Sequence, residues 1–410
     1  MRSRPLPLFG LGLLVGGSLL PIGGAWAQTV SAGSERLVAD VHVREEYDSN
    51  LSGGNEAFAS LRDVRQADWS TSLGASVTAN LPSGRRLLYL KGAFDTTSYQ
   101  RNTQLNNTSV NFAAGVQQGF HACVANANVA YSRQLTPGNE LIIAVDRNIT
   151  ADRTVSGGLT CTRGHLQASA QGRYSRVTNS ANSSGLLDYD SWGADGTVGY
   201  TDHFFGSLSF LGGYNKVSYD TGENTAPLFV SGYRTTNFGV RYSRAIGLRL
   251  SGTADFTYQT AESDIRALLL SGVARQKHSG LSASVAMAYQ LGRRTQLNFA
   301  YSHGVTPQTQ LNTGFDVTDS FRFSASHTIG QRISLSASAS QVNTDYGGVF
   351  IGTLQPLESD RVRSVSGSAS VKIGRHLRLS ADAEHQNRRG NLSIYDYSSD
   401  RVGISLAGVL

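Results

Sequence analysis

Charged and polar side chains recur at every second position along several stretches of this chain. Asp40, His42, Arg44 and Glu46 form one such run near the N-terminus. Because alternate residues of an extended strand point to the same face, each run gathers its charges on one side. Such a face can hold a polar or anionic group through charge-assisted hydrogen bonds.

The sequence carries none of the common signatures of catalysis. It contains no Gly-x-Ser-x-Gly elbow, no His-Glu-x-x-His motif and no Gly-Lys phosphate loop. The nine histidines are scattered, mostly near expected turns, and the two cysteines are far apart, so no metal-like spacing emerges. We therefore expect no enzymatic activity, no cofactor and no metal site. An outer-membrane lipid hydrolase would need Ser, His and an acid together on one rim, and that set cannot be assembled.

The element that must position these residues is a strand of roughly ten residues followed by a turn, repeated from about residue 37 to the end. In the clearest copy the apolar positions are Leu281, Ala283, Val285, Met287, Tyr289 and Leu291, with small or polar residues between them. Period two over many strands, without an intervening helix, indicates an all-β protein. A soluble sandwich would bury the apolar face, whereas a transmembrane barrel exposes it to lipid and has a wet interior.

Composition narrows these alternatives. Beyond residue 28 no stretch approaches 18 consecutive apolar residues and the mean hydropathy is −0.22, which excludes a helical membrane protein. A closed barrel satisfies its backbone groups in lipid even at such low hydropathy. The formal net charge of +6 is too small for the dense basic surface of a nucleic-acid binder.

The first residues predict export. Arg2 and Arg4 precede an apolar stretch at 11–20, and Ala25-Trp26-Ala27 provides a small-x-small cleavage site. We interpret residues 1–27 as a signal peptide for Sec-type export, cleaved near Ala27. Residues 28–35 would be a short periplasmic segment, and residues 36–410 a single outer-membrane β-barrel of a Gram-negative bacterium.

Short and long connections alternate along this barrel region. Six short turns combine Gly with a nearby basic residue, as in Ser83-Gly84-Arg85-Arg86, and two more lie near His121 and His203. Nine long polar segments lie between them, which is the pattern of short periplasmic turns and long extracellular loops. We predict an antiparallel up-and-down barrel of about 18 strands with both termini in the periplasm. The predicted strands are 36–47, 68–81, 86–98, 107–119, 122–133, 149–162, 165–177, 189–200, 204–218, 235–245, 248–260, 280–291, 295–303, 318–328, 333–343, 362–373, 377–386 and 399–410.

Two details of this pattern stay open. The Leu268-Leu269-Leu270 run within 261–280 fits a loop, a short helix or an extra strand. Aromatic residues such as Trp69, Trp192 and Tyr200 cluster near strand ends, as in the girdles of a barrel, although a soluble sheet could use them as core or edge pairs. The last residue, Leu410, departs from the terminal aromatic usual in outer-membrane barrels.

Cys123 and Cys161 are expected to form a disulfide. If strands 122–133 and 149–162 pair antiparallel about residue 142, the two cysteines lie directly opposite one another. Each cysteine is also an even number of positions from an outward residue, Val129 for Cys123 and Leu159 for Cys161, so both cysteines are expected on the outward face. The periplasm oxidises thiols. The alternative is two unpaired thiols.

If the apolar face of each strand meets lipid, the residues on the opposite face line the lumen. Charge there costs little, whereas Arg or Lys facing lipid would cost about 2–4 kcal/mol at the midplane. Serine ladders such as Ser334, Ser336, Ser338 and Ser340 share the inner face. These charges could orient a polar or anionic solute, or they could simply pair and keep the pore hydrated. The predicted pore-lining residues are Arg44, Lys91, Asp95, Arg173, Asp195, Arg241, Asp255, Arg322, Lys372, Asp382 and Glu384.

The first strand resembles that of the outer-membrane β-barrel porins encoded with bacterial exopolysaccharide genes. In that family an acidic residue, Tyr, Asp and Asn close the strand, here Glu46, Tyr47, Asp48 and Asn50. The resemblance implies a channel for polysaccharide export and supplies no catalytic residues.

Two functions are therefore retained. The first is a porin-like channel for hydrophilic solutes, with exported exopolysaccharide as one of them. The second is a structural or adhesive barrel whose lumen is closed and whose extracellular loops bind a partner. In either case we expect contact with outer-membrane lipid and lipopolysaccharide, insertion by the barrel-assembly machinery, and no nucleic-acid partner.

Overall fold

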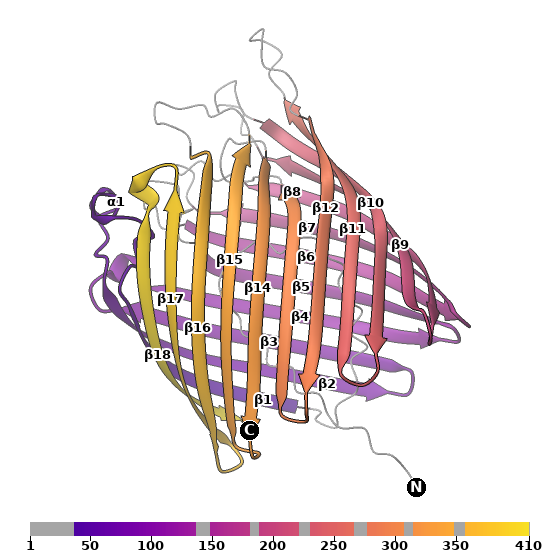
Figure 1. The fold of residues 1–410 in the computed structure, drawn as a ribbon, viewed down its shortest axis with the longest axis horizontal. Coiled ribbons are helices and arrows are strands. Elements are labelled where there is room, and N and C mark those ends of the chain that lie inside the picture. Colours follow the sequence, from indigo (N-terminus) through magenta and orange to yellow (C-terminus); the bar gives the residue numbers. More distant parts are fainter. Residues whose placement is uncertain are drawn as a thin grey trace. The chain divides into compact units, whose positions relative to one another are not determined.

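The chain forms an 18-stranded antiparallel β-barrel (Figure 1). The computed structural model describes residues 37–136, 148–180, 188–220, 230–265, 277–306, 315–347 and 357–409. The strands are β1 Leu37–Asp48, β2 Asp68–Ser83, β3 Arg86–Tyr99, β4 Asn107–Phe120, β5 Cys123–Thr136, β6 Asn148–Arg163, β7 Leu166–Asn179, β8 Tyr189–Asp202, β9 Gly206–Tyr219, β10 Val230–Ile246, β11 Leu250–Ile265, β12 Lys277–Leu291, β13 Thr295–Thr306, β14 Phe315–Ile329, β15 Ile333–Gly347, β16 Ser359–Ile373, β17 Leu377–Gly390 and β18 Tyr397–Val409.

Every strand pairs antiparallel with its neighbours in sequence, and the first strand closes the sheet against the last. Val41 is opposite Gly408 of β18 on one side and Ala75 of β2 on the other. Closure leaves no sheet edge, so all strands can satisfy their backbone groups within the sheet, as a lipid environment requires. The predicted fold class, strand number and up-and-down topology are confirmed.

The short periplasmic turns lie where the sequence predicts them. Gly164 and Gly374, for example, have φ of 60° and 70°, the left-handed conformation that glycine adopts without a Cβ penalty. The β4–β5 turn differs, because its positive φ of 24° falls on His121 and not on glycine.

Several strands extend beyond their predicted limits at the extracellular ends. The structure extends β10 back to Val230, β13 on to Thr306 and β16 back to Ser359. The added residues of β16 are all polar, whereas those of β10 and β13 mix polar residues with Val230, Tyr233 and Val305, so regular hydrophobic alternation stops before the hydrogen-bonded ladder does. The region 261–280 that the sequence leaves open is partly strand, because β11 continues to Ile265 and β12 begins at Lys277. Residues 268–270, the predicted leader 1–27 and the segment 28–35 lie outside the described residues.

The predicted disulfide is confirmed. Cys123 of β5 and Cys161 of β6 are register partners near the periplasmic turns, and their sulfur atoms are bonded. The register runs without interruption from this pair to Thr136 opposite Asn148. The disulfide therefore joins two strands that the ladder already aligns.

A small apolar cluster packs two extracellular connections together. The helix α1 (Glu56–Leu61) lies between β1 and β2, and its cap Asn55 accepts a hydrogen bond from the Phe58 backbone N–H at 3.0 Å. The ring of Phe58, which is fully buried, packs edge-on against Tyr395 of the short 3₁₀ helix η2 (Ser393–Tyr395). Leu357 completes this cluster. Burial raises the pKa of Tyr395, and the nearby Arg388 opposes the rise.

A second 3₁₀ helix, η1 (Thr103–Leu105), lies between β3 and β4. None of the helices in the described ranges is long and apolar enough to cross a membrane.

Candidate functional site

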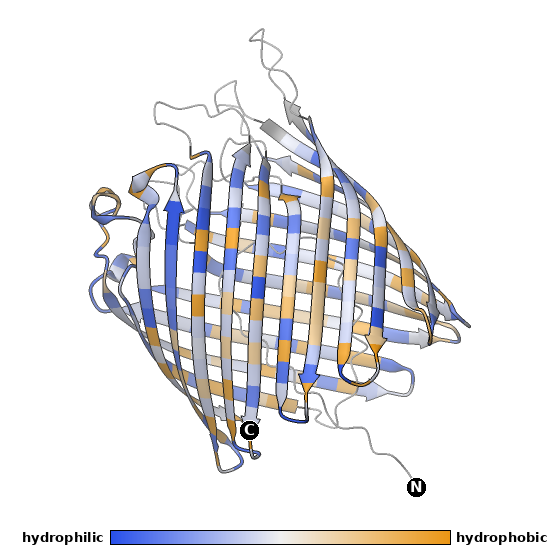
Figure 2. Ribbon diagram, viewed as in Figure 1, coloured by the Kyte–Doolittle hydropathy of each residue, from blue (hydrophilic) through white to orange (hydrophobic). Residues whose placement is uncertain are grey.

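The two faces of each strand differ in side-chain character. In β16, Val365 is 60% exposed and shares its face with Gly367, Ala369 and Val371, whereas Ser364, Ser366, Ser368 and Ser370 occupy the other face. Hydrophilic and hydrophobic residues alternate in the same way along most of the barrel (Figure 2). Exposed apolar side chains on one face of so many strands indicate the surface that meets lipid.

All eleven predicted pore-lining residues alternate out of phase with the exposed apolar residues of their strands. Arg322, for example, lies between Phe321 and Phe323, which are 43% and 48% exposed. They therefore share the face opposite the apolar one. Their role in lining a pore stays a prediction. The others follow the same rule: Arg44, Lys91, Asp95, Arg173, Asp195, Arg241, Asp255, Lys372, Asp382 and Glu384.

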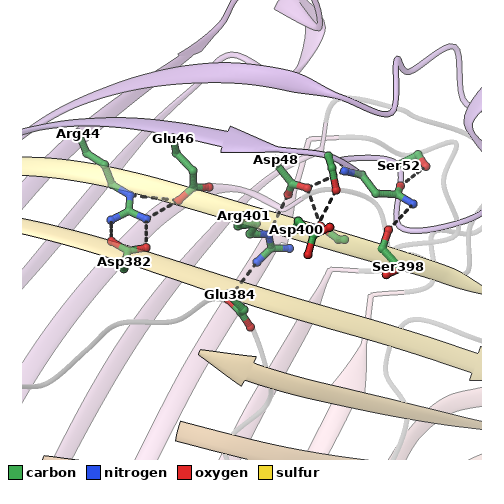
Figure 3. A network of polar contacts seen from close by, with 12 residues as sticks. Arg44, Glu46, Asp48, Ser52, Asp382, Glu384, Ser398, Asp400 and Arg401 are labelled. Carbon is green, nitrogen blue, oxygen red and sulfur yellow. Dashed lines mark hydrogen bonds and ion pairs between the residues drawn. The ribbon is translucent and has the colours of Figure 1, made fainter. Parts of the chain in front are cut away.

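The structure brings Arg44 and Asp382 together across an intervening strand (Figure 3). Arg44 Nη1 and Nη2 donate to the two carboxylate oxygens of Asp382 at 2.6 and 2.8 Å, and Nη2 also donates to Glu46 Oε2 at 2.6 Å. β18 lies between β1 and β17, and its Gly403 is the register partner of Asp382 on one side and of Glu46 on the other. A Cβ there would collide with Arg44 Nη2. Glycine therefore permits this bidentate pair.

Glu384 joins a second cluster one step nearer the extracellular end. Arg401 Nε donates to Asp48 Oδ2 at 2.8 Å, and its Nη1 is 3.8 Å from Glu384 Oε2. Asp48 is only 5% exposed and also accepts from the Ser399 hydroxyl at 2.7 Å. These contacts connect β1, β18 and β17 where the barrel closes (Figure 3).

The same cluster explains the motif that closes the first strand. The Asn50 backbone N–H donates to Asp48 Oδ1 at 2.7 Å, and its side-chain amide donates to the Gly54 carbonyl at 3.0 Å. Tyr47 packs against Trp69 of β2 with 5.3 Å between ring centroids. The motif thus fixes the end of β1 and the start of the following loop.

Asp95 and His42 also meet across an intervening strand at the position of a glycine, as Arg44 and Asp382 do. His42 Nε2 is 2.9 Å from Asp95 Oδ1, although β2 lies between their strands. The β2 residue at this level is Gly74, where a Cβ would collide with both side chains. His42 also lies 3.5 Å from Asp40.

Arg241 and Asp255 are direct cross-strand partners of β10 and β11. Arg241 Nε and Nη2 donate to the two Asp255 oxygens at 2.6 and 3.1 Å, and the Ser284 hydroxyl donates to Oδ2 at 3.2 Å. With side chains about one-fifth exposed, this is the best shielded of the predicted charge pairs.

Four of the predicted residues are not brought into such clusters. Lys91, Arg173, Asp195 and Arg322 form no hydrogen bond or ion pair with the residues the structure describes. The charged face therefore combines ion pairs with charges that have no such partner, although Arg173 and Asp195 are close enough to interact electrostatically. Charges without a partner dominate the electrostatic field acting on a passing ion.

Hydroxyl pairs continue this face between β15 and β16. Ser336–Ser368, Ser338–Ser366 and Ser340–Ser364 are hydrogen-bonded at 2.6, 2.7 and 2.7 Å. Each hydroxyl keeps acceptor capacity for water or a sugar hydroxyl.

Sequence reasoning missed the residues that bring these charges together. Gly74 and Gly403 lie on the charged parity of their strands, and their position opposite charged residues two strands apart is the signal that could have identified them. The described residues contain no group of three or more His, Cys, Asp or Glu able to hold a metal ion.

Comparison with known proteins agrees with this architecture. Residues 270–408 match the model of the family described as "Putative beta-barrel porin 2". No curated protein shows significant sequence similarity to the chain.

Solved structures share the fold at low sequence identity. The outer membrane protein OpdK from Pseudomonas aeruginosa is 12% identical with a TM-score of 0.50, covering 91% of this chain and 99% of OpdK. The FrpB iron transporter from Neisseria meningitidis is 11% identical with a TM-score of 0.50, covering 86% of this chain and 62% of FrpB. Acinetobacter baumannii OccAB3 is 9% identical with a TM-score of 0.49, covering 91% and 99%. The chain therefore shares a β-barrel fold with OpdK and FrpB.

Proposed function

We propose that this barrel is an open channel for hydrophilic solutes. The observation that carries the proposal is the separation of its two faces: apolar residues are exposed on one, while charges and hydrogen-bonded serines share the other. A closed barrel of this strand number encloses a lumen wider than side chains alone fill. The eleven pore-lining residues would then be solvated by channel water, which makes their charges inexpensive.

Exported exopolysaccharide is the polymer we propose for this channel. The support is the motif Glu46, Tyr47, Asp48 and Asn50, which resembles porins encoded with exopolysaccharide genes, together with the wall of serine hydroxyls. Hydroxyl and charged groups in mixed order can exchange hydrogen bonds with a sugar chain without a single tight site. Deletion of the gene should then lower extracellular polysaccharide and leave its synthesis inside the cell unchanged. Equal secretion in the deletion strain would remove this part of the proposal.

A liposome permeability assay tests the channel itself. Vesicles containing the folded protein should swell in neutral sugars and oligosaccharides up to a size limit, while vesicles containing heat-denatured protein should not.

The cluster of Phe58, Leu357 and Tyr395 is the observation that keeps the closed, loop-binding barrel as the second candidate, because it orders two extracellular connections. Vesicles that stay impermeable with correctly folded protein would favour that second function.

A further inference from the structure

Three arginines lie on the outer face at the extracellular ends of β16 and β17. Arg361 and Arg363 share the face of Val365, which is 60% exposed, and Arg389 is the register partner of Arg361. They therefore lie just beyond the apolar surface and on its side of the wall. The loop-bearing ends of β16 and β17 are correspondingly hydrophilic (Figure 2).

A ladder of amide side chains orients two of these guanidinium groups. Arg361 Nε donates to Asn343 Oδ1 and Arg363 Nε donates to Gln341 Oε1, each at 2.9 Å, and Gln341 Nε2 donates to Asn343 Oδ1 at 3.3 Å. The arginines are held through Nε alone. Their terminal amino groups have no hydrogen-bond partner among the described residues.

The positive charge of this cluster is poorly neutralised. Within the described ranges no carboxylate forms an ion pair with Arg361, Arg363 or Arg389. The adjacent Arg388 differs, because it is buried on the opposite face and pairs with Asp360 at 2.5 Å. Asp345 is the remaining carboxylate beside the three arginines, so the cluster keeps an excess of positive charge.

These side chains surround a shallow groove of about 430 Å³. That volume is within the range of small-ligand sites, although this groove is polar and open. It is bordered by Asn343, Asp345, Arg361, Arg363, Asn387 and Arg389. A ligand filling it would meet guanidinium and amide donors beyond the membrane's apolar layer, with the exposed apolar wall of β16 directly beneath.

We propose that this groove binds the phosphate headgroup of an outer-leaflet glycolipid. Guanidinium forks match phosphate oxygens in geometry and charge. The lipid's acyl chains would lie along Val365 and Val371, which a free anion could not use. The site depends on the lipid-facing assignment of this wall and not on an open channel, so its failure and that of the proposed function are distinguishable.

The test compares two variants from which the same charge has been removed. R361Q/R363Q/R389Q removes the cluster, whereas R294Q/R332Q/R375Q removes three arginines from periplasmic turns. Delipidated protein in detergent micelles is titrated with bisphosphorylated lipid A and analysed by native mass spectrometry, after gel mobility with and without heating has confirmed folding. We expect at least about tenfold weaker binding for the first variant, equivalent to about 1.4 kcal/mol, and no change for the second. Equal binding by both variants would overturn the proposal.

Two further measurements distinguish a phosphorylated lipid from a free anion and from the effects of misfolding. Asp345→Asn removes the groove's opposing carboxylate, so it should strengthen lipid A binding, a gain that misfolding cannot produce. Dephosphorylated lipid A should bind the native protein weakly, and millimolar inorganic phosphate should compete poorly. Undiminished binding of the dephosphorylated lipid, or displacement by inorganic phosphate alone, would contradict a lipid-phosphate site.

Discussion

At the scale of single residues, two inward glycines decide which charges meet. The alternation of the sequence predicts that Arg44 and Asp382 share a face, and the structure places them on one. It does not predict that they form a bidentate pair, because they are 338 positions apart and belong to strands that are not neighbours. That contact follows from barrel closure and from Gly403 between them, which only the three-strand register reveals.

The contact gives a prediction for Gly403→Ala. The added Cβ would displace the Arg44 guanidinium and separate it from Asp382, leaving both charges to water. We expect a loss of about 1 kcal/mol in the free energy of unfolding, since the pair is partly solvated. Gly367→Ala, whose Cβ would make only an ordinary contact at 3.9 Å, is the matched control. Equal urea stability of the two variants in detergent would contradict the role given to Gly403.

At the scale of elements, the pairing of β5 with β6 gives the sharpest agreement between sequence and structure. Counting equal distances from residue 142 places Cys123 opposite Cys161, and the register confirms it.

The extracellular ends of the strands could not be predicted as well as this pairing. In β16 the ladder continues through Ser359, Asp360 and Arg361, and backbone hydrogen bonds leave no mark in a hydropathy pattern. The helix α1 was missed because its six residues depend on Phe58 meeting Tyr395, a distant part of the chain.

We expect the disulfide to stabilise the barrel but not to be required for its folding. Both cysteines should resist alkylation in the native, unreduced protein and react after reduction in denaturant. Replacing both by Ala should lower the free energy of unfolding by about 2–4 kcal/mol and leave a folded barrel, because the ladder aligns the same strands. Reductant should then change the stability of the native protein only. A double variant as stable as the oxidised protein would argue against this view.

The loop cluster is tested by two substitutions in one short helix. Phe58→Ala empties the fully buried position between α1 and η2, a change that typically costs about 3–5 kcal/mol in a packed core. Protease added to whole cells should therefore cleave the β1–β2 connection at least several-fold faster. Leu61→Ala, at a position 56% exposed, should leave the cleavage rate near that of the native protein. Similar rates for both variants would show that the cluster does not hold this loop.

At the scale of the whole molecule, channel function depends on which barrel face meets lipid. The sequence predicts this from the alternation alone, and nearly all exposed apolar residues of the described strands follow it, with Val124 of β5 an exception. The sequence could not predict how the charges of the other face are distributed between neutralised pairs and isolated groups. Arg241 is paired with Asp255, whereas Arg322 has no ion-pair partner among the described residues. Isolated charges of this kind should dominate ion selectivity.

Measurement of the reversal potential in planar bilayers tests the assignment of the two faces most directly. Arg322→Glu changes an isolated charge on the proposed lumen face, and Arg363→Glu makes the same change on the outer face. We predict steady conductance for the native protein, a shift toward cation selectivity for Arg322→Glu, and the native reversal potential for Arg363→Glu. A bilayer that stays sealed with folded protein, or a shift produced by Arg363→Glu and not by Arg322→Glu, would contradict an open channel lined by the charged face.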